Sequence, residues 1–102
     1  MNRAASNITL VCYDITSCKL RREIVKCMKN FGMRLQFSVF LCRLDACGVS
    51  RCREKLQKLL KLLQEEIVSD DSLIIFERFA PDAADCLLGA PIERKLPTFE
   101  IF

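Results

Sequence analysis

The chain has 102 residues, of which 51% are hydrophobic and 28% are charged. This length suits one folded domain, and this apolar content excludes an intrinsically disordered chain. No apolar run approaches the roughly 18 to 20 residues that cross a bilayer, and no apolar stretch before Asn7 resembles a secretory signal. The sequence therefore predicts a cytoplasmic protein without a membrane partner.

Charge is distributed unevenly along the chain. Residues 1–63 hold 13 Lys or Arg and 4 Asp or Glu, a balance of +9, whereas residues 64–102 hold 3 and 9, a balance of −6. A segregated basic half suits a polyanionic partner such as nucleic acid. The alternative is that two helices carry solvated basic faces, and charge alone leaves both interpretations open.

The first half of the chain begins with a β-branched and apolar stretch, 7–15, which predicts a buried strand. Thr16 or Ser17 is then suited to cap a helix, whose apolar residues recur at helical spacing. Gly32 supplies the expected stop of that helix. Residues 34–44 alternate between polar and apolar side chains and include the β-branched Val39, which predicts one long bent strand or two short ones.

The second half predicts another helix and another strand. Ser50 is the expected cap of a helix with an apolar stripe that extends to Ile67. A turn at Asp70 and Asp71 then leads into a strand over 72–79. The order β-α-β-β-α-β predicts an α+β fold, a ferredoxin-like sandwich with both helices on one face of a mostly antiparallel sheet.

The sequence divides into a ferredoxin-like domain, 1–80, and a C-terminal extension, 81–102. The extension is rich in turn residues and ends in an alternating, strand-like stretch, 97–102. Because large apolar side chains are costly to expose, this stretch either folds back on its own domain or adds to the sheet edge of a partner chain. We expect it to be an extra strand exchanged at a dimer interface.

Seven cysteines raise the question of disulfides or zinc. The chain has no C-x-x-C pair and no His, and structural zinc sites usually draw on such pairs or on His. We therefore expect reduced thiols, several of them acting as small core hydrophobes.

Candidate catalytic groups are few. Without His, a Ser–His or Cys–His nucleophile is excluded within one chain, and no Gly-rich phosphate loop is present. Asp14 remains, at the end of the first predicted strand. A carboxylate in an apolar strand needs a metal, a cation or a helix N-terminus to satisfy it, and capping of the following helix is one of these alternatives.

Three stretches together resemble the CRISPR-associated Cas2 family: a strand ending in an aromatic-Asp-aliphatic triplet, an Arg-bearing first helix, and a Gly-x-Arg-x-Gln-x-Ser-Val-Phe motif. Here they are Val11-Cys12-Tyr13-Asp14-Ile15, Arg21-Arg22 and Gly32-Met33-Arg34-Leu35-Gln36-Phe37-Ser38-Val39-Phe40. Residues 71–76 also resemble a later strand of the family. Leu41 departs from the pattern, since many members carry an acidic residue there, and this departure weakens the case for nuclease activity.

The resemblance implies a homodimer in which two copies of Asp14 face each other across the twofold axis. Such a pair would hold one Mg²⁺, a cation commonly bound by one or two carboxylates together with substrate phosphates, and would serve as the catalytic centre. The nucleic-acid contacts implied are Arg21, Arg22 and Arg34, with Tyr13 as a base-stacking residue. Solvated surface charge is the alternative for the arginines, and core packing for Tyr13. Ser38 and Phe40 would support the site.

The resemblance also implies a prokaryotic function in CRISPR adaptation. The homodimer would bind nucleic acid, duplex DNA or single-stranded RNA, with the Cas1 integrase during spacer acquisition. Mg²⁺-dependent endonuclease activity on RNA or DNA is a second implication, and members of the family differ in whether they have this activity. An mRNA-cleaving toxin like the VapD proteins, which share the fold, is the remaining alternative.

Overall fold

The computed structural model describes residues 7–80 and 85–90. Along the chain the elements are β1 (Ile8–Asp14), α1 (Cys18–Met28), β2 (Gly32–Gln36), β3 (Val39–Arg43), α2 (Ala46–Leu62), the 3-10 helix η2 (Gln64–Glu66) and β4 (Ser72–Phe76). The predicted β-α-β-β-α-β order is confirmed, and the stretch predicted as one bent strand or two short ones forms two. The predicted exchanged strand, 97–102, lies outside the described residues.

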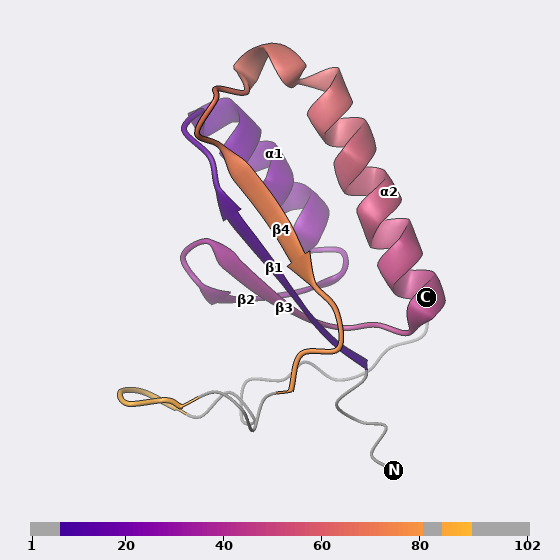
Figure 1. Ribbon diagram of the computed structural model, residues 1–102, viewed down its shortest axis with the longest axis vertical. Helices are drawn as coiled ribbons and strands as arrows, with labels where there is room; N and C mark the ends of the chain where they lie inside the picture. Colours follow the sequence, from indigo (N-terminus) through magenta and orange to yellow (C-terminus); the bar gives the residue numbers. More distant parts are fainter. Residues whose placement is uncertain (1–6, 81–84, 91–102) are drawn as a thin grey trace.

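The strands form one antiparallel sheet in the order β2-β3-β1-β4, with β1 between β3 and β4. Both helices cover the same face of this sheet (Figure 1). This arrangement confirms the α+β, ferredoxin-like sandwich. The first strand in the sequence therefore lies at the centre of the sheet, and its end emerges beside the start of α1.

The hydrophobic core fills the space between the sheet and the two helices. On α1 the buried residues are spaced by four, Leu20, Ile24 and Met28, so that one stripe of the helix faces the sheet. Each fully buried side chain of this size contributes about 1.5–3 kcal/mol. The same core cluster includes, from the sheet and from α2, Val11, Tyr13, Phe40, Cys42, Cys52 and Leu56.

The helix ends differ in part from the predictions. Ser17 caps α1, its side chain accepting a hydrogen bond from the Leu20 amide at 3.1 Å, as one of the two predicted caps. The predicted cap of α2 is wrong, since Asp45 accepts from the Gly48 amide at 2.7 Å and Ser50 lies within the helix. The Leu-rich stripe indicates the middle of α2. The first turn of the helix consists of small residues, so the sequence pattern does not show where the helix begins.

Gly32 does not terminate α1, so that prediction is also wrong. The helix ends at Met28, and Gly32 is the first residue of β2, opposite Cys42 of β3. A Cβ atom on Gly32 would lie 2.9 Å from the Cys42 Cα and would also clash with the Leu41 carbonyl oxygen. The glycine is thus required for the close approach of two strands.

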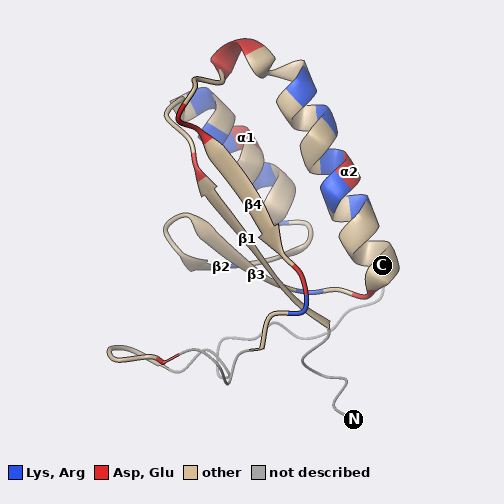
Figure 2. Ribbon diagram, in the orientation of Figure 1, with Lys and Arg blue, Asp and Glu red and all other residues tan. Residues whose placement is uncertain are grey.

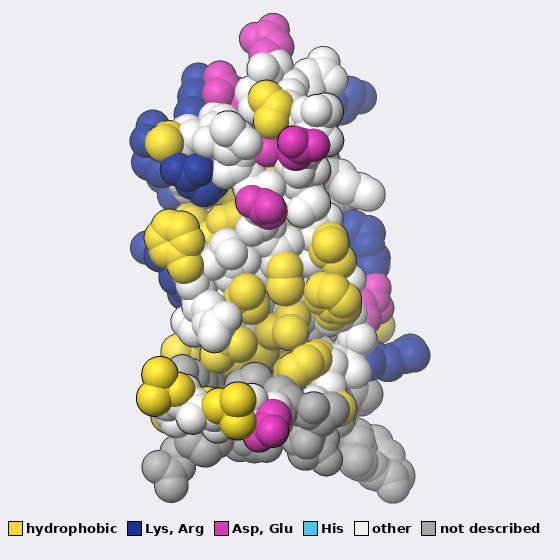
Figure 3. Space-filling model, turned by 60° about the vertical axis from the view of Figure 1, so that its left-hand side comes forward, with side chains coloured by type: hydrophobic (Ala, Val, Ile, Leu, Met, Phe, Trp, Pro, Cys, Tyr) yellow, Lys and Arg dark blue, Asp and Glu magenta, His cyan; other side chains and the backbone are white. Residues whose placement is uncertain are grey.

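The face of the sheet opposite the helices is largely apolar and partly open, since Ile8 and Leu41 on it are buried and Ile74 and Phe76 are exposed. Strand alternation directs Leu10, Cys12 and Asp14 to this face, because their neighbours Val11 and Tyr13 belong to the core. Their partners on β4 are Phe76, Ile74 and Ser72. Figure 3 shows hydrophobic side chains gathered across the middle of this side of the molecule. We call this surface the open sheet face.

Candidate nucleic-acid interface

The loop between β1 and α1 follows Asp14 and is held by two acidic residues from the segment between α2 and β4. Asp71, at the start of the β4 region, accepts a hydrogen bond from the Thr16 amide at 2.9 Å. Glu66 of η2 accepts one from the Ser17 hydroxyl at 2.6 Å. The acidic segment therefore lies beside the β1–α1 loop, where Figure 2 shows it at one end of the molecule.

Asp71 is committed to this anchoring function. Amide hydrogen bonds from Val68 and from Thr16, both 2.9 Å long, lower the pKa of its carboxyl group. Asp14, in contrast, is exposed at the end of β1, and the helix that follows it is capped by Ser17. Capping of α1 by Asp14, one of the alternatives for this residue, is therefore wrong.

Arg21 closes the same loop from the other side. Its Nη1 donates hydrogen bonds to the carbonyl oxygens of Ile15, at 2.9 Å, and Thr16, at 3.1 Å, and its Nη2 donates to Cys18 Sγ at 3.0 Å. None of these acceptors is a carboxylate, so no ion pair offsets the positive charge of the guanidinium group. The hydrogen bonds hold this charge beside the loop that follows Asp14.

The β2–β3 hairpin faces α1 across a gap and supplies a second cation. The Arg34 guanidinium carbon lies 5.9 Å from the ring centre of Phe37 and 5.8 Å from that of Phe40, both within cation–π range. The hairpin is held to β1 by two hydrogen bonds of Tyr13. Its hydroxyl donates to the Phe37 carbonyl oxygen at 3.1 Å, and its amide donates to that of Ser38 at 3.0 Å.

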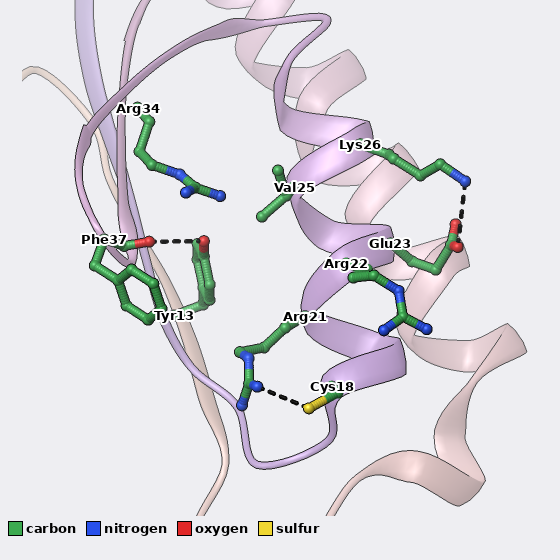
Figure 4. A pocket seen from close by; sticks show the side chains of 9 residues that line it. All are labelled: Tyr13, Cys18, Arg21, Arg22, Glu23, Val25, Lys26, Arg34 and Phe37. Carbon is green, nitrogen blue, oxygen red and sulfur yellow. Dashed lines mark hydrogen bonds and ion pairs between the residues drawn. The ribbon is translucent and has the colours of Figure 1, made fainter.

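A hollow of about 420 Å³ lies between this hairpin and α1, and we call it the basic hollow. Figure 4 shows Arg34 and Phe37 on the hairpin side and Val25 and Arg21 on the helix side, with Tyr13 at its floor. Glu23 and Lys26 point away from the hairpin and form an ion pair of 3.5 Å. The complete lining is Tyr13, Cys18, Arg21, Arg22, Glu23, Val25, Lys26, Arg34 and Phe37.

All four residues predicted to contact nucleic acid line the basic hollow. Arg22 and Arg34 are exposed, and Arg21 is partly exposed. Tyr13 is only 4% exposed and its ring centre lies 6.5 Å from that of Phe40, so the structure favours its alternative role in core packing. Its participation in base stacking stays a prediction.

The other three predicted site residues lie outside the hollow. Phe40 is fully buried in the core, and Ser38 contributes a backbone carbonyl group to the hairpin anchor. Asp14 extends from the same strand as Tyr13 but onto the open sheet face. Sequence reasoning missed five residues of the hollow, Cys18, Glu23, Val25, Lys26 and Phe37, although Phe37 stands within the motif that carries the family resemblance.

A metal ion would find few ligands within one chain. Across residues 7–80 and 85–90, no three His, Cys, Asp or Glu side chains lie close enough together to hold one. All seven cysteines are free, and burial raises the pKa of Cys42 and of Cys52 to about 12, which keeps both as neutral thiols. Within the described residues Asp14 is thus not part of a metal-binding cluster, and the predicted Mg²⁺ stays a prediction.

Comparison with known proteins places the chain in a family. The family model described as CRISPR associated protein Cas2 matches residues 7–80. A CRISPR-associated endoribonuclease Cas2 from Rhodospirillum rubrum is 32% identical over 89 residues, which cover 86% of this chain and 67% of the relative. Another, from Chloroflexus aurantiacus, is 34% identical over 59 residues, which cover 58% of this chain and 63% of that protein.

Solved structures share the architecture. A hypothetical protein from Thermus thermophilus superposes with a TM-score of 0.58 at 32% identity, covering 70% of this chain and 79% of its own. Cas2 from Streptococcus pyogenes superposes with a TM-score of 0.54 at 23% identity, covering 91% of this chain and 99% of its own, and supports the fold alone. In the described part of the chain, no helix is long and apolar enough to span a bilayer.

The chain belongs to the CRISPR-associated Cas2 family.

Proposed function

We propose that this protein is a nucleic-acid-binding subunit of CRISPR adaptation that acts as a homodimer. The observation that carries the proposal is that Arg21, Arg22 and Arg34 all line the basic hollow, Arg21 and Arg34 from its two sides and Arg22 from the outer side of α1 (Figure 4). Neither of the ion pairs present in residues 7–80 and 85–90 involves these arginines. Guanidinium groups match phosphate oxygens bidentately, so Arg22 and Arg34 are suited to contact a phosphodiester backbone, while Arg21, which holds the β1–α1 loop, adds positive charge beside them.

The open sheet face supports the homodimer. Met33 on β2 and Ile74 and Phe76 on β4 are 44–48% exposed there, and exposed apolar side chains gathered on one face are typical of an interaction site. A second copy of the same face would cover it through a twofold axis, the commonest symmetry of soluble oligomers. Asp14 lies on this face, so the same packing would bring two Asp14 carboxylates toward the interface.

Two facing Asp14 side chains would hold one Mg²⁺ and support endonuclease activity. Mg²⁺ keeps several waters and is commonly bound by one or two carboxylates and substrate phosphates, which suits an exposed carboxylate from each chain. The cation would activate a bound water and stabilise charge on the phosphodiester. The chain has no His, so no histidine base takes part in this proposal.

Membership of the Cas2 family favours a CRISPR function over the VapD-like toxin. The relatives in Rhodospirillum rubrum and Chloroflexus aurantiacus are named endoribonucleases. We infer that in spacer acquisition the homodimer holds duplex DNA together with the Cas1 integrase. The arginines of the basic hollow and the surface of the dimer would serve this architectural function without cleavage.

Single arginine substitutions test the binding site. We expect Arg22→Ala and Arg34→Ala each to weaken duplex binding, and to lower the slope of log K against log salt by about 0.9 if one phosphate contact is lost. Arg21 is unsuitable because it also holds the β1–α1 loop. Fluorescence anisotropy across a salt series measures both quantities.

The matched control is Lys61→Ala, which removes an exposed cation from the last turn of α2, outside the basic hollow. It should leave the slope at the wild-type value. If the two arginine variants behave like this control, the basic hollow is solvated surface and the proposal is wrong.

A further inference from the structure

The basic hollow has an aromatic side, formed by Phe37. Phe37 is 78% exposed at the tip of the β2–β3 hairpin, although exposing a phenyl ring to water is unfavourable. Its backbone is nevertheless held in place, because its carbonyl oxygen accepts the Tyr13 hydroxyl hydrogen bond. The ring is therefore presented on an anchored hairpin.

Val25 extends the apolar surface from the opposite side of the hollow. Figure 4 shows it on α1, pointing toward the hairpin, with the guanidinium group of Arg34 above the gap and that of Arg21 below. The volume of about 420 Å³ is within the range of about 300–1,000 Å³ that is typical of small-ligand pockets. Apolar side chains on two sides, flanked by cations, are suited to a flat aromatic group that is linked to a negatively charged group.

We propose that the basic hollow binds one unpaired nucleotide, at a single-stranded end or overhang of the nucleic acid. This inference rests on the proposed function and adds to it. The base would stack on Phe37 and pack against Val25, while Arg34 and Arg22 contact the adjoining phosphates. Bases inside a duplex are stacked on their neighbours, so only an unpaired base offers a free face to Phe37.

The cation–π contact between Arg34 and Phe37 supports this assignment. A guanidinium plane also stacks on bases, so Arg34 and Phe37 together form one surface on which a base rests. Stacking of this kind tolerates any base, and the hollow would therefore recognise an unpaired nucleotide without sequence preference.

The test compares a blunt duplex with the same duplex bearing a short 3′ overhang that contains 2-aminopurine. We expect the overhang to tighten wild-type binding roughly tenfold, and stacking to quench the 2-aminopurine fluorescence. Phe37→Leu should abolish the quenching and make the affinities for the overhang duplex and for the blunt duplex equal, whereas Phe37→Trp should retain the gain and the quenching. Leu62→Ala, which shortens another side chain that is 78% exposed, is the matched control.

The outcomes separate this inference from the proposed function. An overhang gain that survives Phe37→Leu overturns the inference and leaves duplex binding intact. Loss of Cas1 binding in Phe37→Leu with an unchanged overhang gain also overturns it, because Phe37 would then contact protein. If the wild type fails to bind the blunt duplex, only the proposed function is contradicted. The inference is then tested with a single-stranded oligonucleotide. Equal affinity of the wild type and of Phe37→Leu for this oligonucleotide overturns the inference.

Discussion

Replacing Asp14 by Asn is expected to reduce Mg²⁺-dependent cleavage by about 100-fold or more, equivalent to about 3 kcal/mol of transition-state stabilisation. The amide is nearly isosteric but lacks the charge that holds Mg²⁺. The fold should be unaffected, because Asp14 is exposed and Ser17 caps the following helix. Cleavage of RNA and of duplex DNA, measured with Mg²⁺ and with EDTA, checks the prediction.

The same variant separates chemistry from architecture. Its binding to duplex DNA and to Cas1 should equal that of the wild type, since these depend on the arginines and the dimer surface, and spacer acquisition should persist. Cleavage at the wild-type rate would remove Asp14 from the mechanism. Loss of acquisition by a folded, DNA-binding variant would show that the carboxylate is required, and the architectural proposal would be wrong.

Ile74→Glu is expected to convert the dimer into a monomer. Ile74 lies on the open sheet face opposite Cys12 and is 47% exposed, so the monomer can accept a charge there. At a twofold interface the charge would be buried beside its own mate, which costs several kcal/mol and should raise the dimer dissociation constant by about 100-fold or more. Sedimentation velocity over a concentration series measures this constant.

The control places the same charge elsewhere. Leu62→Glu changes an apolar residue that is 78% exposed at the end of α2, on the side of the helices. It should remain dimeric, and circular dichroism should show both variants folded. A dimer constant unchanged by Ile74→Glu would mean that the open sheet face is not the dimer interface.

The fold could be predicted because its signals are local and repeated. β-branched alternation marks β1, and spacing by four marks the buried stripe of α1, so element types and their order followed directly. Helix ends were less predictable, because Asp45 and Ser50 are both suitable caps and only packing distinguishes them. The role of Gly32 depends on how closely β3 approaches, a distance that the sequence does not contain.

The residue types of the candidate site could be predicted from the sequence, but their location in the fold was harder to predict. The arginines were found from their charge and their motif, and the fold brings them together from α1 and from β2. Phe37 was missed as a site residue because an aromatic residue in a strand pattern normally indicates the core, whereas here it lies at the exposed hairpin tip. The hydrogen bonds of Glu66 and Asp71 to the β1–α1 loop span 49 and 55 residues, so local patterns do not reveal them.

Hydrogen exchange mapped by mass spectrometry, with and without duplex DNA, tests most directly the claim that the basic hollow is the nucleic-acid interface. The account predicts slower exchange in α1 and in the hairpin, 18–28 and 32–43, because these elements form both walls of the hollow. Exchange along α2 from Arg51 to Lys61 should be unchanged. Protection confined to α2, with none in α1 or in the hairpin, would contradict the account.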